Sequence, residues 1–366
     1  MLIRSICLEN FRNYEQGLFT FSENVNVITG ENAQGKTNLL ESLYLLTGSR
    51  SWRTRFDREL IRFGSEQGSI RAEIFSEDRE QKLEMLFRRG QRRKITKNGV
   101  GKTATELMGT INAVLFCPDD LNIVRDGAAC RRKFMDSALC QLRPKYAEML
   151  GRYNKLWEHK SACLKQLRDF PEIPLPLSEI NDQMCALDAQ LIRYRASFVR
   201  RIAEKAAEIH SEFSGERERL ELQYKTVSTV TDPLAPASEI YEQVMAHQLS
   251  HDRAEKESVS CLTGIHKDDI EICINGMPAR QFASQGQART AALSLKMAER
   301  LIFLEETGEA PILLLDDVLS ELDEKRQEFV LNRMVGGQTF ITCCEGADIA
   351  SRTGGRVLTI ENGRGI

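Results

Sequence analysis

The sequence predicts an α/β fold in which one domain, with an antiparallel β-subdomain, is interrupted by an inserted helical lobe. A glycine-rich loop at residues 30–37 lies between an apolar strand pattern and a helix pattern. A second apolar strand, residues 312–317, ends in two carboxylates. From residue 119 to residue 257, the apolar spacing changes from a period of two to a period of about 3.6. Residues 1–118 and 258–366 are therefore expected to form lobe I, with residues 119–257 as lobe II.

Residues 30–37 fit the phosphate-loop pattern, in which two glycines separated by four residues are followed by Lys and Thr. A strand, loop and helix in this order aim backbone N–H groups and the positive end of the helix dipole at a phosphate. Lys36 is expected to reach the β- and γ-phosphates, and the Thr37 hydroxyl to ligate Mg²⁺. The expected nucleotide-binding residues here are Gly30, Glu31, Asn32, Ala33, Gln34, Gly35, Lys36 and Thr37.

The paired carboxylates Asp316 and Asp317 supply the second half of such a site. Unpaired carboxylates at the end of an apolar strand cost several kcal/mol, so packing does not explain them. Asp316 is expected to hold Mg²⁺, and Asp317 to position or deprotonate an attacking water.

Composition limits the remaining classes of protein. The chain has 366 residues and a net charge of −3, so any attraction to nucleic acid must come from local patches. No apolar run has the length of a membrane helix, and the first residues lack the apolar core of a signal peptide, so a cytoplasmic location is expected. The ten cysteines include no Cys-x-x-Cys pair, which favours reduced thiols. A zinc set of Cys261, His266 and Cys273 is disfavoured because structural zinc takes four closely spaced ligands.

Two stretches are rich in basic residues. Residues 51–62 carry four arginines, and residues 88–97 carry six basic residues and no acid, between patterns typical of antiparallel strands. The second stretch is either the solvated tip of a hairpin or a contact with a phosphate backbone, and the sequence leaves both open.

Two further motifs narrow the class. Ser284-Gln285-Gly286-Gln287, at the start of a predicted helix, resembles the signature motif of ATP-binding-cassette ATPases, and residues 320–323 resemble their D-loop. In that class, the signature serine of one subunit caps the γ-phosphate held by the phosphate loop of the other. The resemblance therefore implies an ATP-dependent head-to-tail homodimer, with Ser284, Gly286, Gln287 and Asp323 among the nucleotide-binding residues.

Along nearly its whole length the chain resembles the RecF family, bacterial recombination-repair ATPases related to the heads of structural-maintenance-of-chromosomes proteins. The matching motifs are residues 8–14, 30–37, 51–54, 116–121, 131–136, 264–269, 284–287 and 313–323. The resemblance implies an ATP- and Mg²⁺-dependent DNA-binding protein of recombinational repair and replication restart. It would recognise gapped or junction DNA and, with RecO and RecR, help RecA to load on single strands.

The chain departs from the cassette pattern at several positions. Asp317 stands where the cassette class usually has Glu, and its shorter side chain implies slow hydrolysis. The switch histidine of the class is missing, and Thr342 is the candidate in its place. Cys117 occupies the expected position of the Q-loop glutamine. His266 is either a hydrogen-bonded structural histidine or part of a site.

Basic residues in the matching motifs and the hairpin are the candidate DNA contacts: Arg53, Arg88, Arg92, Arg93, Arg131 and Arg132. Three other classes remain as alternatives. A transporter cassette would pair with membrane subunits, and another chromosome-structural head would need a coiled-coil arm longer than lobe II can form. A small-molecule kinase would have neither a signature motif nor a D-loop.

Overall fold

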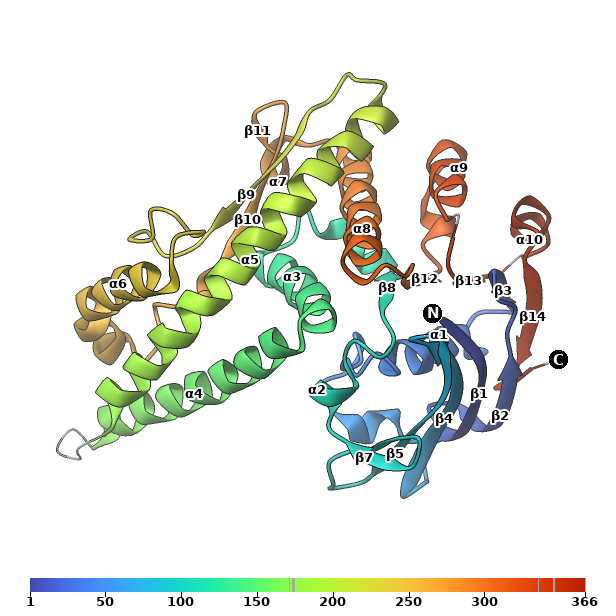
Figure 1. Cartoon of the computed structure of the whole chain (residues 1–366), viewed down its shortest axis with the longest axis horizontal. Helices are drawn as coiled ribbons and strands as arrows, with labels where there is room; N and C mark the ends of the chain where they lie inside the picture. Colours follow the sequence, from blue (N-terminus) through green and yellow to red (C-terminus); the bar gives the residue numbers. More distant parts are fainter. Residues whose placement is uncertain (171, 173–174, 335, 345, 366) are drawn as a thin grey trace. The chain divides into compact units, whose positions relative to one another are not determined.

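The computed structural model describes residues 1–170, 172, 175–334, 336–344 and 346–365 (Figure 1). The chain divides into two compact units, residues 1–122 with 292–366 (the first unit) and residues 123–291 (the second unit). The predicted class is confirmed: an α/β unit with an antiparallel sheet is interrupted by a largely helical unit. Both boundaries differ from the predicted ones. The larger difference is at residues 258–291, which belong to the helical unit and not to lobe I.

The reason for this correction is strand pairing. β10 (Asp269–Ile274) pairs antiparallel with β9 (Leu220–Lys225), and β11 (Met277–Pro278) joins them in a separate three-stranded sheet. The return of a strand pattern after residue 258 therefore signals a second sheet within the helical unit, which periodicity alone cannot distinguish from a return to the first.

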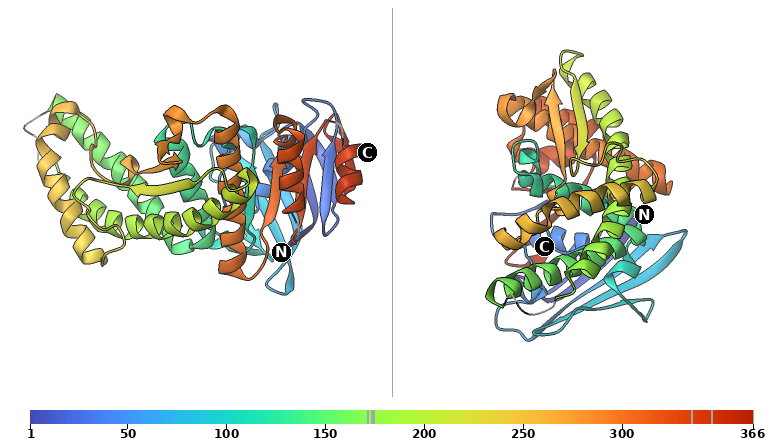
Figure 2. Two further views of the ribbon diagram at one scale, coloured as in Figure 1. Left: turned by 90° about the horizontal axis from the view of Figure 1, so that it is seen from above. Right: turned by 90° about the vertical axis from the view of Figure 1, so that its left-hand side faces the viewer.

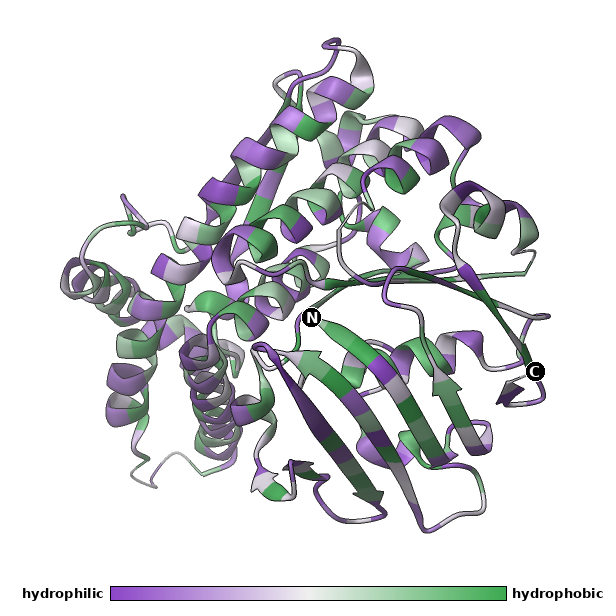
Figure 3. Cartoon of the chain, turned by 45° about the vertical axis from the view of Figure 1, so that its right-hand side comes forward, coloured by the Kyte–Doolittle hydropathy of each residue, from purple (hydrophilic) through white to green (hydrophobic). Residues whose placement is uncertain are grey.

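The first unit contains a six-stranded antiparallel sheet in the order β2-β1-β4-β5-β6-β7. The strands are β1 (Leu2–Phe11), β2 (Tyr14–Thr20), β4 (Gln67–Ser76), β5 (Arg79–Arg88), β6 (Lys94–Lys97) and β7 (Val100–Lys102). Buried and exposed residues alternate along β4 and β5, and Figure 3 shows the same alternation as bands of hydropathy. One face of this sheet therefore packs on the core of the unit.

The second sheet of this unit has the order β15-β14-β3-β13-β12-β8, and all neighbouring strands except the β15 pair are parallel. Its strands are β3 (Val25–Thr29), β8 (Ala113–Phe116), β12 (Ile312–Asp316), β13 (Thr339–Cys343), β14 (Arg356–Glu361) and β15 (Arg364–Gly365). β3 and β12 flank β13, so the carboxyl ends of the loop-bearing strand and the acid-bearing strand meet at one edge.

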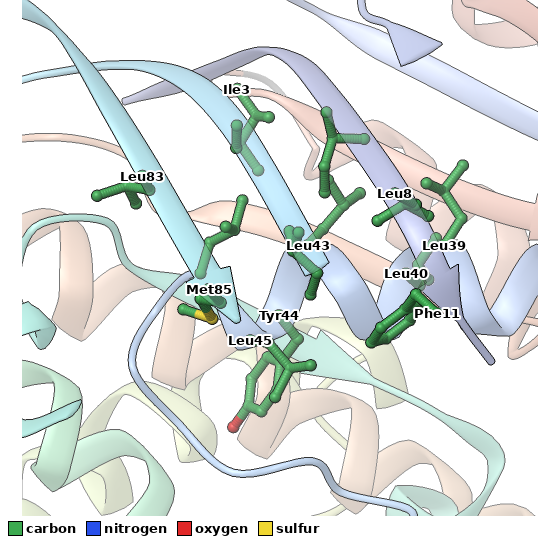
Figure 4. Packing of buried hydrophobic residues seen from close by; sticks show 14 of the residues in the cluster. Ile3, Leu8, Phe11, Leu39, Leu40, Leu43, Tyr44, Leu45, Leu83 and Met85 are labelled. Atoms are coloured by element: carbon green, nitrogen blue, oxygen red, sulfur yellow. The ribbon is translucent and has the colours of Figure 1, made fainter. Parts of the chain in front are cut away.

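Helix α1 (Lys36–Leu45) fixes the phosphate loop to this framework. Its side chains Leu39, Leu40 and Leu43 share one core with Leu8 and Met85 of the antiparallel sheet (Figure 4). Burial of these apolar groups, at about 25 cal/mol per Å² of apolar surface, anchors the helix and with it the loop at its start. The other short helices of the unit are η1 (Asp57–Leu60), α2 (Ala104–Leu107), η2 (Pro118–Asn122), η4 (Leu319–Glu321), α9 (Glu324–Asn332) and α10 (Ala347–Thr353).

The second unit is built around α5 (Leu177–Ser214), the longest helix in Figure 2, which packs against α4 (Pro144–Asp169). Leu187, Leu191 and Phe198 recur on its buried face, as the helical spacing predicts. Its other helices are α3 (Ala128–Leu142), α6 (Ala237–Ser258), η3 (Ile265–Lys267) and α7 (Ala279–Phe282). Helix α8 (Gln285–Thr307) begins in the second unit and ends in the first.

Candidate nucleotide site

The backbone of the predicted phosphate loop has a conformation that requires glycine at two positions. Gly30 and Gly35 have φ values of +146° and +118°. A Cβ atom at Gly30 would lie 2.3 Å from the carbonyl oxygen of Ile360, and one at Gly35 would lie 2.7 Å from Nδ2 of Asn13. The loop therefore fits only with both glycines, as close approach of a backbone to its surroundings requires.

Side chains outside the motif hold the loop in place. Asn13 donates from Nδ2 to the Gln34 carbonyl at 2.8 Å, and the Tyr14 hydroxyl donates to the Gly35 carbonyl at 2.9 Å. The turn before β15 adds a backbone bond from Gly363 to the Gln34 carbonyl at 3.2 Å. Sequence reasoning missed these supports. The only signal was that Asn13 and Tyr14 belong to a matching motif with no assigned role.

Lys36 is directed back over the loop that it follows. Its ammonium donates to the carbonyls of Gly30 at 2.6 Å and Glu31 at 2.9 Å, and its side chain is buried. The exposed thiol of Cys344, just after β13, lies 3.8 Å from the same nitrogen. The positive charge is thereby held inside the concave loop, where a phosphate group would meet it.

Asp316 and Thr37 come together at the strand edge as predicted. The Thr37 hydroxyl donates to Oδ1 of Asp316 at 2.8 Å, and the Thr342 hydroxyl donates to the same oxygen at 3.0 Å. Burial raises the pKa of Asp316, while these two hydroxyl bonds act in the opposite direction. A carboxylate beside a hydroxyl is the donor set that Mg²⁺ prefers in phosphate-loop sites.

Thr342 and Asp317 are linked as well. The Asp317 amide donates to the Thr342 hydroxyl at 2.8 Å, so one threonine contacts both acids. Asp317 itself has a φ of +51°, an uncommon conformation for a residue other than glycine. The Ser320 hydroxyl donates to the Asp317 carbonyl at 2.6 Å and lies 3.2 Å from Oδ1. The Asp317 backbone therefore leaves the strand conformation, and Ser320 contacts both its carbonyl and its side chain.

The D-loop residue Asp323 has a local role in the structure. It is the N-cap of α9, where its Oδ1 accepts from the Arg326 amide at 3.0 Å, and its carboxylate also pairs with the Arg326 guanidinium. Its side chain remains about half exposed. Capping fixes its position at the surface without removing it from solvent.

The signature residues lie in the second unit, at the start of α8. The Gln287 amide donates to the Ser284 hydroxyl at 3.2 Å, and the Ser284 amide donates to Oε1 of Gln287 at 2.9 Å. This reciprocal pair is a capping box. Nε2 of Gln287 donates to Glu218 at 2.9 Å. Ser284 is exposed and Gly286 lies in the first turn, so the helix presents its N-terminus as predicted.

The Q-loop position is occupied by a buried thiol. Cys117 directly follows β8 and is 6% exposed. Its amide donates to Oδ2 of Asp120 at 2.9 Å, and burial raises the pKa of its thiol. The side chain packs in the protein interior, so Cys117 does not supply the polar contact that a Q-loop glutamine would.

The candidate arginines of the first unit fall into two groups. Arg88 and Arg92 are exposed on the basic hairpin. Arg93, also in the hairpin, pairs with Asp57 at 3.1 Å and has a side chain that is only 10% exposed. Arg53 donates to Oδ1 of Asn38 on α1 at 2.6 Å, and its charge acts to lower the pKa of Asp316. Arg53 therefore lies beside the nucleotide site.

Arg131 and Arg132 are tied into the second unit. Arg131 is 4% exposed, pairs with Asp269 at 2.6 Å and donates to two backbone carbonyls. Burial and these partners occupy its guanidinium, which weighs against the expected DNA contact. Arg132 donates to the Asp268 carbonyl at 2.7 Å. His266 is hydrogen-bonded to the Tyr153 hydroxyl and to the Cys261 carbonyl, both at 3.0 Å. These bonds favour the first of the two alternatives, a hydrogen-bonded structural histidine.

The fold and this site define a phosphate-loop ATPase head, and the model of the "RecF/RecN/SMC N terminal domain" matches residues 2–348. Curated relatives named DNA replication and repair protein RecF narrow the class further. The relative from Acetivibrio thermocellus is 38% identical over 94% of both chains. The one from Clostridium acetobutylicum is 36% identical over 100% of this chain and 99% of its own. The chain belongs to the RecF family, and the resemblance inferred from its motifs is confirmed.

Solved structures agree with this membership. One is described as the recombination mediator protein RecF-ATP in the RecFOR pathway. It has a TM-score of 0.91 and 32% identity, and the match covers 100% of this chain and 96% of the other. A structure of an Smc head domain from Pyrococcus furiosus has a TM-score of 0.57 at 16% identity, covers 99% and 94% of the two chains, and shows the shared fold. DNA replication and repair is the process in which the family acts, which sets aside the transporter and kinase alternatives. Along the described residues, no helix has both the length and the apolar content of a membrane span.

Proposed function

We propose that the chain is an ATP-gated DNA-binding protein that dimerises head to tail around Mg-ATP and acts on gapped or junction DNA. The observation that carries this proposal is the meeting of Lys36, Thr37 and Asp316 at one strand edge. The RecF relative solved with ATP supports the choice of nucleotide.

Each residue of the site has a defined part. Lys36 binds the β- and γ-phosphates from within the loop, together with the loop amides. Thr37 and Asp316 hold Mg²⁺, for which the donor set fits: two oxygens 2.8 Å apart, with the carboxylate bonded by hydroxyl groups. The ion, when bound, neutralises charge on the phosphates. Asp317, oriented by Ser320 and Thr342, positions or deprotonates a water, and its short side chain makes hydrolysis slow.

In the proposed dimer, the signature motif at the nucleotide site comes from the second copy of the chain. Ser284, at the exposed N-terminus of α8, is proposed to cap the γ-phosphate bound by its partner, with Gly286, Gln287 and Asp323 nearby. The positive end of a helix dipole suits a phosphate oxygen. ATP binding would then close the dimer and hydrolysis would reopen it, so that the nucleotide acts as a timer.

DNA contacts are proposed for the exposed arginines of the basic hairpin, Arg88 and Arg92, with Arg53 and Arg93 holding the surrounding loops. Such contacts go mainly to phosphates, so binding should weaken steeply with salt and depend little on sequence. RecR and RecO are the proposed partners in the cytoplasm, where the complex would help RecA to load on single strands. The RecFOR pathway named for the solved relatives supports these partners.

Sedimentation velocity with and without ATP, alone and with gapped DNA, tests the scheme. ATP should double the mass, and DNA binding should follow the dimer. Lys36→Ala should abolish both effects. Lys82→Ala, which removes an exposed lysine from β5, is the matched control and should behave as wild type. Full ATP-dependent dimerisation by Lys36→Ala would contradict the scheme.

A mixing experiment tests whether the partner completes the site. Lys36→Ala and Ser284→Arg should each be inactive as ATPases when alone. In a head-to-tail dimer of one variant with the other, one site combines the intact Lys36 of one chain with the intact Ser284 of the other. Mixing should therefore restore part of the activity. If the mixture stays as inactive as its components, Ser284 does not act across the dimer.

A further inference from the structure

Phe63 is the first of the two central residues of a surface turn and is almost completely in solvent. The turn closes with a bond from the Ser65 amide to the Arg62 carbonyl at 3.0 Å, and Gly64 has a φ of +85°, as a turn of type II requires. The Phe63 side chain is 97% exposed. Single apolar residues at a surface are common, so exposure alone does not indicate a site.

The turn is held rigidly and not left as a loose loop. The Arg62 amide donates to the Asn10 carbonyl at 2.8 Å, and the Ser65 hydroxyl donates to Oδ1 of Asn10 at 3.2 Å. Ile61, just before it, forms a bridge with Phe11 of β1. The ring is therefore presented from a fixed backbone, which reduces the entropy that binding would cost.

Arginines surround this turn because the basic hairpin lies directly beside it. The Arg89 amide donates to the Glu66 carbonyl at 3.2 Å, and Nε of Arg89 donates to the Ser65 carbonyl at 2.9 Å. The combined surface, which we call the Phe63 platform, has a positive balance against the acids Glu15 and Glu66. Its basic members are Arg62, Arg88, Arg89 and Arg92. Glu15 pairs with Arg62 at 3.4 Å.

A second phenylalanine in the same segment, Phe56, differs from Phe63 in how its ring is covered. Phe56 is 46% exposed, and the guanidinium carbons of Arg58 and Arg55 lie 4.8 Å and 5.7 Å from its ring centroid. Arginines of its own segment thus cover that ring. At 97% exposure, both faces of the Phe63 ring are open to a ligand. A flat apolar ring within a cationic rim suits a ligand with flat apolar faces and anionic edges.

We propose that Phe63 stacks on the terminal base pair where duplex DNA meets a single-stranded gap, while the arginines of the platform contact the flanking phosphates. Inside a duplex, each base pair is stacked on both faces and offers nothing to an aromatic ring. At a gap, the last base pair has one free face. Stacking by Phe63 would thereby distinguish a gapped duplex from an intact one, whereas phosphate contacts alone would bind both equally. This inference depends on the proposed DNA-binding function.

The test compares a relaxed closed circular duplex with the same circle carrying one gap, because neither substrate has the blunt ends of a linear duplex, whose terminal base pairs would also be open to stacking. Binding of each is measured in the presence of ATP at one salt concentration. Phe63→Ala should reduce the preference for the gapped circle about tenfold, in line with aromatic stacking on a base, and leave binding to the closed circle within about twofold. Phe63→Trp should keep the preference, and Phe63→Leu should lose it.

Phe170→Ala is the matched control, since it removes a phenylalanine that is 60% exposed in the second unit. It should bind both circles as wild type does. A crosslink by 5-iododeoxyuridine placed in the base pair at the gap should map to the peptide that contains Phe63.

The possible outcomes distinguish a failure of the stacking role of Phe63 from a failure of the proposed DNA-binding function. If wild type binds DNA with ATP but Phe63→Ala keeps the same preference, or loses affinity for both circles equally, the stacking role is overturned and the proposed function stands. If Phe63→Ala changes only the binding of a protein partner, the platform is a protein interface and the inference fails. If wild type binds neither circle with ATP, the proposed function itself fails.

Discussion

Both units of this protein bury aspartates, and Asp316 in the first unit differs from Asp268 in the second in the groups that neutralise it. In the first unit, Asp316 is 6% exposed and accepts from the hydroxyls of Thr37 and Thr342. In the second, Asp268 is fully buried and pairs with Arg195 at 2.7 Å, while Tyr224 also bonds it. Burial raises the pKa of both carboxyls.

The difference separates a ligand site from a structural cluster. Arg195 bonds Asp136 on α3, Asp268 before β10 and the Ile265 carbonyl, so the second unit supplies its own countercharge. Asp316 is bonded by neutral hydroxyls, at the edge where the phosphate loop also ends. A buried carboxylate without a bonded cation costs free energy unless a ligand completes it, which is why the surroundings of Asp316 support the proposed metal site and those of Asp268 do not.

The largest predicted effect is the loss of the arginine. Arg195→Met should lower the free energy of unfolding by about 3–5 kcal/mol, because it leaves the buried carboxylate of Asp268 and the partly exposed carboxylate of Asp136 without their partner. Denaturant unfolding followed by circular dichroism measures it. Arg253→Ala, which removes an arginine with a side chain 91% exposed, should leave the stability unchanged. A loss of less than about 1 kcal/mol in Arg195→Met would mean that the cluster is not a closed structural network.

The next effect is a pH dependence in the same cluster. Asp188 on α5 is 2% exposed, accepts from the Ile265 amide at 3.0 Å, and burial raises its pKa from 3.8 to about 7. The folded state thus keeps a proton that the unfolded chain releases. The stability due to this group is complete below about pH 4 and is lost as the pH rises through 7.

Asp188→Asn keeps the acceptor oxygen and removes the titration. Relative to the variant, wild type should lose on the order of 2–4 kcal/mol between pH 4 and pH 8. Unfolding free energies of both proteins across this range measure the difference. Lys160, Arg195 and Asp268, which interact with Asp188, are the same in both proteins. Parallel curves would show that Asp188 ionises at its ordinary pKa.

The same substitution in Asp268 and in Asp316 should have opposite consequences, and its effect on stability should be smaller than the two effects above. Asp268→Asn should cost about 2 kcal/mol of stability, because Arg195 loses a charged partner. Asp316→Asn should leave the stability unchanged or raise it, while ATP hydrolysis falls to background. Thermal unfolding and phosphate release are measured on both variants. Equal destabilisation by the two changes would remove the distinction between a ligand site and a structural cluster.

The smallest predicted effect concerns the threonine that links both acids of the first unit. Thr342→Val keeps the shape of the side chain and removes the hydroxyl bonded to Asp316 and to the Asp317 amide. It should cost about 1 kcal/mol of stability and slow ATP turnover without weakening nucleotide binding. Unchanged turnover would mean that Thr342 supports the fold and does not orient the acids.

Local patterns in the sequence were enough to predict the strand, loop and helix at Lys36 and the buried strand that ends at Asp316. Both depend on residues within about ten positions of one another, where periodicity and glycine content decide the structure. The capping box between Ser284 and Gln287 could be predicted in the same way, because its two residues are three positions apart. The family followed from the order of these motifs along the chain.

Contacts between residues that are distant in the sequence could be determined only from the tertiary structure. The pairing of β9 with β10 moved residues 258–291 into the second unit, and the packing of α3 turned Arg131 from a candidate DNA contact into a buried ion pair. The contacts of Asn13 with the loop and of Thr342 with both acids also join elements far apart in the chain. A sequence records which side chains carry charge, but the fold determines which of those charges are neutralised internally and which stay available for a ligand.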